Sequence, residues 1–178
     1  MRVVTTTGEF DSIDFVLKTY EAKGVADVTW VGESRVDRGV PLFRAEDIVS
    51  SISRGTQVVV VSRVFFTTGQ ILQGFEKIVE AARAAGALLV VDVYHSAGVI
   101  PLQMEAAGWD FAIGGSYKYL RGGPGACWLA VHPRTLEKDL RSLDTGWFAK
   151  AETFGYARDD VPKFKIGGDG WLESTPAA

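Results

Sequence analysis

The segment 75-FEKIVEAARAAGALLVVD-92 decides the fold of this chain. Its first part carries apolar residues at a spacing that places them on one face of a helix: Phe75, Ile78, Val79 and Ala82. Gly86 ends that pattern, and a continuous apolar run follows and stops at Asp92. An amphipathic helix that leads into a fully apolar strand predicts a βαβ arrangement with a buried parallel sheet.

The same alternation extends to both sides of this segment. The predicted strands are 3–6, 26–31, 57–61, 87–91, 110–113 and 126–131, and the predicted helices are 12–23, 45–52 and 75–85. Apolar strands between helices require a sheet that is covered on both faces. We therefore predict an α/β fold with a mainly parallel sheet and helices on both faces.

The composition is that of an ordinary globular protein. Of 178 residues, 47% are apolar and 23% are charged, which excludes an intrinsically disordered chain. The net charge of −3, without a long run of one sign, argues against a nucleic-acid partner or an anionic membrane surface. The apolar stretches are shorter than the ~18 residues that predict a membrane span.

The single cysteine, Cys127, excludes an internal disulfide framework and a zinc ribbon. Its place in an apolar strand predicts a buried, inert thiol. No signal peptide is recognisable at the N-terminus. We therefore expect a reducing, cytoplasmic location.

Polar and aromatic side chains follow several of the predicted strands. Ligands of open α/β sheets bind beyond the carboxyl ends of the strands, so these residues are the candidates for chemistry. They are Phe10, Ser62, Asp92, His95 and the run Ser116-Tyr117-Lys118. A carboxylate and a lysine at the ends of neighbouring strands would meet in one cleft.

The sequence lacks the patterns that two other kinds of site require. A phosphate-binding P-loop needs G-x-x-x-x-G-K-[ST], which does not occur in the sequence. A metal site needs three well-placed ligands, and Asp92, His95 and His132 do not have a suitable arrangement. What remains is a lysine, Lys118, whose surroundings make it nucleophilic toward a carbonyl cofactor.

An ordered set of motifs carries a family resemblance. The segments are Asp92-Val93-Tyr94-His95-Ser96-Ala97-Gly98, Asp110-Phe111-Ala112, Ser116-Tyr117-Lys118-Tyr119-Leu120 and Gly122-Gly123-Pro124-Gly125. Together they resemble the core of the fold type I pyridoxal phosphate enzymes. More narrowly, they are similar to kynureninase and its relatives in the class V aminotransferase group.

The resemblance implies pyridoxal phosphate as the cofactor and an amino acid as the small-molecule substrate. It implies two catalytic residues: Lys118, which attaches the cofactor, and Asp92, which pairs with the ring nitrogen and keeps it protonated. It implies further cofactor contacts from Phe10, Ser62, His95, Tyr117, Trp147 and Thr175. Phe10 would stack on the ring, and Trp147 would reach the phosphate across the interface of a homodimer.

The chain departs from the family pattern in ways that suggest a fragment. No glycine- or threonine-rich phosphate cup precedes Phe10, and no C-terminal small domain brings an arginine for the substrate carboxylate. Lys150 stands where kynureninases tend to have histidine, and Thr175 where the family commonly has asparagine. We expect residues 1–178 to be part of the cofactor-binding large domain, with 144–178 leading into a missing small domain. Such a chain by itself would bind the cofactor poorly and be inactive.

Three functions fit this pattern. The first is a kynureninase-like hydrolase that cleaves a C–C bond and releases alanine. The second is a class V aminotransferase or a cysteine desulfurase-type enzyme. The third is a non-catalytic fragment or degenerate homologue.

Overall fold

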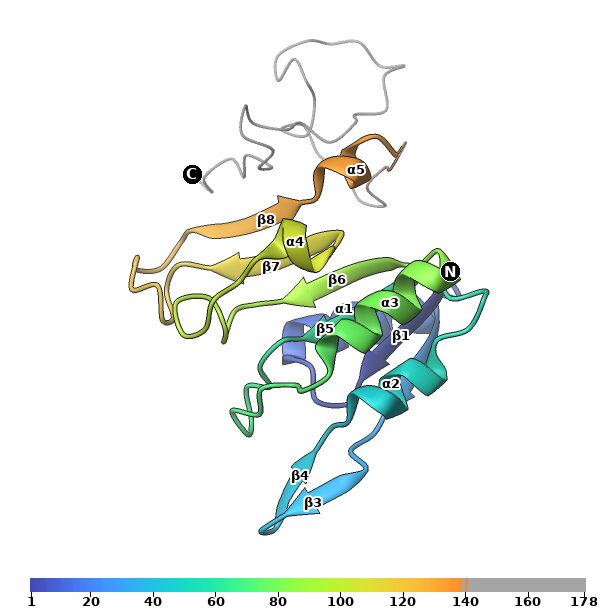
Figure 1. Cartoon of the computed structure of the whole chain (residues 1–178), viewed down its shortest axis with the longest axis horizontal. Coiled ribbons are helices and arrows are strands. Elements are labelled where there is room, and N and C mark those ends of the chain that lie inside the picture. Colours follow the sequence, from blue (N-terminus) through green and yellow to red (C-terminus); the bar gives the residue numbers. More distant parts are fainter. Residues whose placement is uncertain (139, 141–178) are drawn as a thin grey trace.

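The computed structural model describes residues 1–138 and residue 140, and these form one six-stranded sheet, a small hairpin and five helices (Figure 1). In chain order the elements are β1 (Arg2–Thr6), α1 (Asp11–Ala22), β2 (Asp27–Val31), β3 (Arg35–Asp37), β4 (Val40–Leu42), α2 (Ala45–Ser51), β5 (Val58–Ser62), α3 (Phe75–Ala85), β6 (Leu88–Asp92), α4 (Met104–Ala107), β7 (Phe111–Gly115), β8 (Cys127–Val131) and α5 (Pro133–Leu136). Every predicted strand and helix is present, with ends displaced by two residues or fewer. The segment 144–178 lies outside the described residues.

The main sheet has the strand order β2-β1-β5-β6-β7-β8. Neighbouring strands from β2 to β7 run parallel, and β8 runs antiparallel to β7. The change of direction follows from the connection, because the loop between β7 and β8 contains no crossover helix. The predicted mainly parallel sheet is confirmed.

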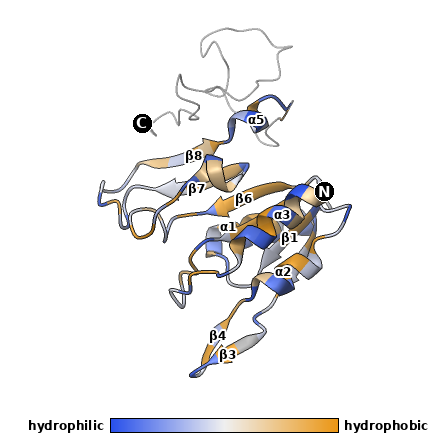
Figure 2. Ribbon diagram, viewed as in Figure 1, coloured by the Kyte–Doolittle hydropathy of each residue, from blue (hydrophilic) through white to orange (hydrophobic). Residues whose placement is uncertain are grey.

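Helices cover both faces of this sheet, as predicted (Figure 1). On one face, Leu17 of α1 packs in a cluster with Val3, Val28 and Val60. On the other face, α2 and α3 contribute to a larger cluster that includes Ile48, Ile78, Val59, Val61, Leu89 and Val91. Alternate residues of β5 thus enter opposite clusters, which is why its sequence is continuously apolar. Figure 2 shows the same apolar character along β6.

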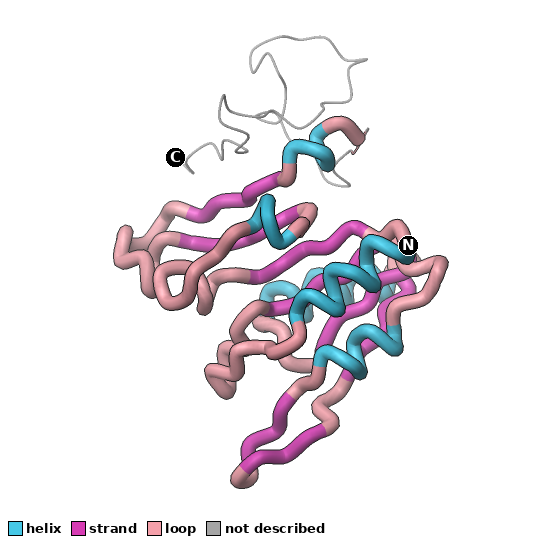
Figure 3. The backbone as a smooth tube through the Cα atoms, in the orientation of Figure 1, coloured by secondary structure: helices cyan, strands magenta, loops and turns pink. Residues whose placement is uncertain are grey.

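The β3–β4 hairpin was not predicted. It projects from the body of the fold, and its tip has Arg38 at φ 50° and Gly39 at φ 81° (Figure 3). Positive φ at both central residues is the requirement of a type I′ hairpin turn. Each of these strands has only three residues, which is too few for an alternation of apolar and polar side chains to indicate a hairpin.

None of the helices within the described residues combines the length and the apolar character that crossing a membrane requires.

The larger cluster should carry much of the stability. Ile78 on α3 is fully buried, so Ile78→Ala should lower the free energy of unfolding by about 3 kcal/mol through lost burial and an unfilled cavity. Val36→Ala on β3, where the side chain is exposed, should change it by less than about 0.5 kcal/mol. Urea titration of both variants tests this, and equal losses would contradict it.

Candidate active site

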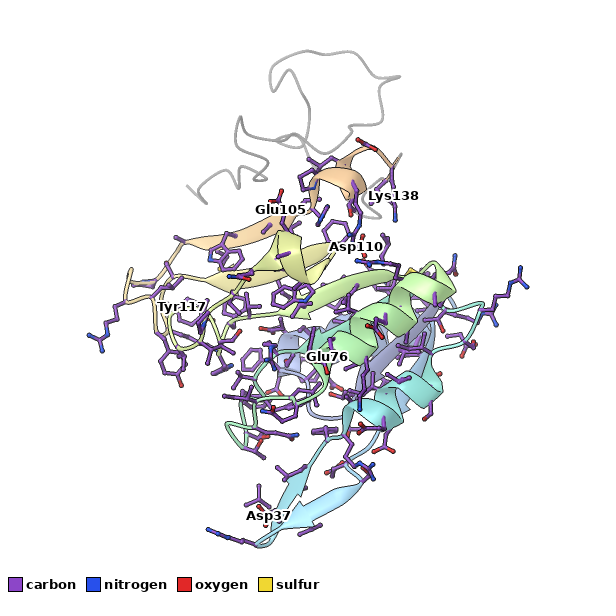
Figure 4. The ribbon with its side chains drawn as sticks, in the orientation of Figure 1. Asp37, Glu76, Glu105, Asp110, Tyr117 and Lys138 are labelled. Atoms are coloured by element: carbon purple, nitrogen blue, oxygen red, sulfur yellow. The ribbon has the colours of Figure 1, made fainter. Side chains whose placement is uncertain are left out.

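Parallel register brings the candidate residues to one edge of the sheet. Ser62 at the end of β5 is paired with Asp92 at the end of β6, and Asp92 is paired with Ile113 of β7. The loops after β5 and β6 therefore start at the same level, and β7 continues two residues further, to Gly115. Tyr117, on the loop after β7, lies at this end of the sheet (Figure 4).

A cavity of about 460 Å³ opens at this edge. Its lining combines one carboxylate, one amine and several aromatic rings: Asp92, Lys118, Phe10, Tyr94, Tyr117 and Trp128. Ile113 and Leu129 add apolar surface from β7 and β8. A mostly apolar cavity with a few polar groups is typical of a small-molecule site.

Lys118 lies among aromatic rings beside a histidine. Its Nζ is 3.0 Å from Nε2 of His95 and 3.4 Å from Nδ1 of the same ring. The ring centroids of Phe10, Tyr94 and Tyr117 are 5.0, 5.3 and 5.9 Å from Nζ. Partial burial lowers the pKa of Lys118, against the opposing charge of Asp92. A lowered pKa increases the fraction of neutral amine, which is the nucleophilic form.

Asp92 is the carboxylate opposite this amine. It is buried, and its Oδ1 accepts a hydrogen bond of 2.8 Å from the backbone N–H of Tyr94. Burial raises its pKa, whereas the Tyr94 N–H and the charge of Lys118 act in the opposite direction. Burial and the Lys118 charge also lower the pKa of His95. The site therefore favours a neutral imidazole beside the lysine.

Glycines allow the walls of the cavity to approach each other. A Cβ at Gly115 would lie 2.5 Å from the ring of Tyr94, and one at Gly114 would lie 2.3 Å from the ring of Trp128. Gly98 has φ +84°, and a Cβ there would lie 3.1 Å from the backbone of Tyr119. This close approach holds the loop after β6 against the loop after β7, so it brings the loop of His95 to that of Lys118.

The structure brings five of the predicted site residues together: Phe10, Asp92, His95, Tyr117 and Lys118. Ser62 is placed differently. Its side chain is buried, and its hydroxyl donates a hydrogen bond of 2.6 Å to Oε2 of Glu9 rather than lining the cavity. The other two predicted contacts, Trp147 and Thr175, lie outside the described residues, as does Lys150.

The prediction for Cys127 was wrong, because this residue is exposed and lines the cavity. It is the first residue of β8, which, among the described residues, is an edge strand with a neighbouring strand on one side. An apolar sequence alone does not distinguish an edge strand from a central one.

The sequence analysis missed two residues near this cavity. Tyr94 contributes its ring to the lining and its N–H to Asp92. Glu9 is 4% exposed, and burial raises the pKa of its carboxyl group to about 7, although hydrogen bonds from Ser62 and Thr6 lower it. The only available signal for Glu9 was its position beside Phe10 in the loop after a strand.

The sequence of residues 2–158 matches the family model described as aminotransferase class-V. The chain belongs to the class-V aminotransferase family. The candidate site lies within the matched part of the chain, from Phe10 to Leu129.

Two relatives of this class-V aminotransferase family member are kynureninases. The chain is 32% identical to that of Pseudomonas fluorescens over 154 residues and 35% identical to that of Deinococcus radiodurans over 153 residues. These alignments cover 86% and 85% of the chain but only 35% of each relative. The resemblance to kynureninases is thus confirmed over about a third of their length.

Solved structures share the fold. The apo cysteine desulfurase of Thermococcus onnurineus NA1 has a TM-score of 0.69 at 22% identity, covering 98% of this chain and 39% of that one. Alanine–glyoxylate aminotransferase of Nostoc sp. has a TM-score of 0.64 at 21% identity, covering 80% and 37%. These likenesses support the predicted fold class.

Glu9 should make the stability of this class-V family member pH-dependent. Its pKa is about 7 in the folded chain and near 4.5 when exposed, so the folded state keeps a proton that the unfolded state releases. The stabilisation is complete below pH 4.5 and disappears as the pH rises through 7. From pH 5 to pH 8, the unfolding free energy should fall by about 2 kcal/mol more than in Glu9→Gln.

Urea titration across this pH range measures the difference. The control is Glu33→Gln, which removes an exposed carboxylate and should follow the unmodified chain. Parallel pH profiles for the unmodified chain and Glu9→Gln would contradict the prediction.

Proposed function

We propose that this chain forms the cofactor-binding part of a pyridoxal phosphate enzyme that acts on an amino acid in a kynureninase-like reaction. The observation that carries the proposal is the placement of Asp92 and Lys118 in one aromatic-lined cavity at the carboxyl ends of parallel strands. The 32% and 35% identities to kynureninases favour this reaction within the family.

The residues of the cavity fit this cofactor. Phe10 offers an aromatic face, Asp92 a buried carboxylate for the ring nitrogen, and Lys118 an amine of lowered pKa for the aldehyde. The cavity of about 460 Å³ falls in the range of small-ligand sites. When bound, pyridoxal phosphate supplies an electron sink for the electron pair left at the α-carbon of the substrate.

Each of these residues then has a definite task. Asp92 keeps a proton on the ring nitrogen, and its burial strengthens this charge pairing. Lys118 attaches the cofactor, and its Nζ is the site within the cavity that can accept a proton from the substrate. Burial and the charge of Lys118 lower the pKa of His95, so its neutral ring can accept a hydrogen bond from Lys118 and orient that amine. Tyr117 lies on the rim, where its hydroxyl can donate to the phosphate.

The reaction we favour is hydrolytic cleavage of the C–C bond between the β- and γ-carbons, which releases alanine. Transamination and desulfuration would use the same cofactor and the same lysine, so the products distinguish these reactions. Alanine together with a carboxylic acid indicates the hydrolysis. A 2-oxo acid indicates transamination, and sulfide or persulfide indicates desulfuration. A non-catalytic homologue would form none of these products.

We also propose that the protein acts in the cytoplasm as a homodimer. The exposed thiol of Cys127 is compatible with a reducing compartment. The exposed apolar side chains Phe15 and Val16 on α1 support burial against another subunit. Trp147 and Thr175 remain predicted cofactor contacts.

The cofactor should be attached to Lys118. Borohydride reduction of the longest natural form of the protein, followed by peptide mass spectrometry, should place the pyridoxyl adduct on this residue. Lys118→Met should abolish the adduct, because Lys118 is the one lysine among the described residues that lines the cavity. An adduct on Lys138 or Lys150 would refute the assignment.

Replacement of the buried carboxylate should separate binding from chemistry. Asp92→Asn should leave the cofactor bound but slow turnover by about a hundredfold or more, because an unpaired ring nitrogen loses its proton. The exposed Asp37→Asn on the hairpin serves as the control and should turn over normally. Steady-state kinetics with a fully loaded enzyme measure the effect, and normal turnover of Asp92→Asn would refute the role.

A further inference from the structure

Glu9 occupies a gap between two strands of the sheet. The β1–β5 ladder contains only the pairs Val3↔Val58 and Val4↔Val59, although β5 continues to Ser62. The carboxyl group of Glu9 bridges these strands beyond the ladder. Thr6 Oγ1 of β1 donates to its Oε1 at 2.6 Å, and Ser62 Oγ of β5 donates to its Oε2 at 2.6 Å.

This gap is the topological switch point of the sheet. From β1 the chain passes to β2 on one side and later to β5 on the other, as the strand order β2-β1-β5 shows. Open α/β sheets bind their ligands at such a point. Glu9 is followed directly by Phe10, whose ring lines the cavity. The anchor of the loop is therefore a buried acid that lies next to a residue of the candidate site.

The groups that face Glu9 explain where a proton would reside. From β1 it is the hydroxyl of Thr6, from β5 they are the hydroxyl and the backbone N–H of Ser62, and from β6 it is the carboxylate of Asp92, whose charge acts on Glu9. Asp92 has a compensating cation in Lys118 and a backbone N–H from Tyr94. For Glu9, burial is the main influence that disfavours the anion, and the charge of Asp92 adds to it. In a pair of interacting carboxyl groups, the group without a cation takes the proton.

We propose that Glu9 is a positioning residue that carries the proton of a buried carboxyl pair, leaving Asp92 anionic and clamping the Phe10 loop to Ser62. In this state the Glu9 carboxyl donates its proton to one of the two hydroxyls and accepts from the other. Ser62 thereby acts on the site through Glu9. The inference rests on the proposed function, because an anionic Asp92 serves as the partner of a protonated ring nitrogen.

The clamp can be measured without the cofactor. Hydrogen–deuterium exchange of the amides of residues 8–10 reports opening of the loop, after correction for the intrinsic exchange rate at each pH. Protection in the unmodified protein should fall about tenfold from pH 6 to pH 8, as Glu9 loses its proton beside Asp92. Glu9→Gln, which stays neutral, should show less than about a threefold change, and the control Glu33→Gln should behave like the unmodified protein. The same tenfold fall in Glu9→Gln would overturn the proposal.

A second measurement links the clamp to the site. Pyridoxal phosphate affinity at pH 6, determined with the longest natural form of the protein, should be nearly unchanged in Glu9→Gln. It should be at least about tenfold weaker in Glu9→Leu, which can engage neither hydroxyl. Equal affinity of Glu9→Leu and the unmodified protein would overturn the positioning role. If the unmodified protein binds no pyridoxal phosphate, the proposed function fails, whereas the exchange experiment still decides whether Glu9 is the clamp.

Discussion

The alignment of β5, β6 and β7 is the constraint on which the site depends. Ser62, Asp92 and Ile113 lie side by side because parallel strands share one register and end at one edge. The apolar side chains of β5 help to fix that register, since a shift by one residue would move each of them into the opposite apolar cluster. The position of Asp92 is thus set by packing that has no direct part in the chemistry.

Burial at this edge has opposite effects on the pKa values of the basic and the acidic groups. It lowers the pKa of Lys118 and His95 and raises the pKa of Asp92 and Glu9. Lys118 and Asp92 partly compensate each other, so each supports the charged form of the other. Glu9 has hydroxyl groups as hydrogen-bond partners, and burial raises its pKa to about 7. A neutral acid and an anionic acid can therefore be close neighbours in one buried cluster.

The aromatic walls of the cavity depend on small residues in the sheet. Tyr94 and Trp128 lie directly over Gly115 and Gly114, where any Cβ would displace them. Phe66 continues this wall, with its ring edge-on to Phe10 at 5.2 Å. Aromatic side chains without glycines beneath them would fill the cavity rather than line it.

The sequence by itself determined the α/β class, the succession of the main strands and helices along the chain, and most of the site around Asp92, His95 and Lys118. These features are local: strands and helices have their own periodicity, and functional residues of such sheets follow the strands directly. The tertiary structure decided the burial of Glu9, the orientation of Ser62 toward it and the exposure of Cys127. Each of these features depends on which strands are neighbours and on where they separate. Glu9 and Ser62 are 53 positions apart in the sequence and come into contact only once the sheet has formed. A pattern along the chain does not show which distant residues come together, so the buried acid at the switch point could be identified only in the folded molecule.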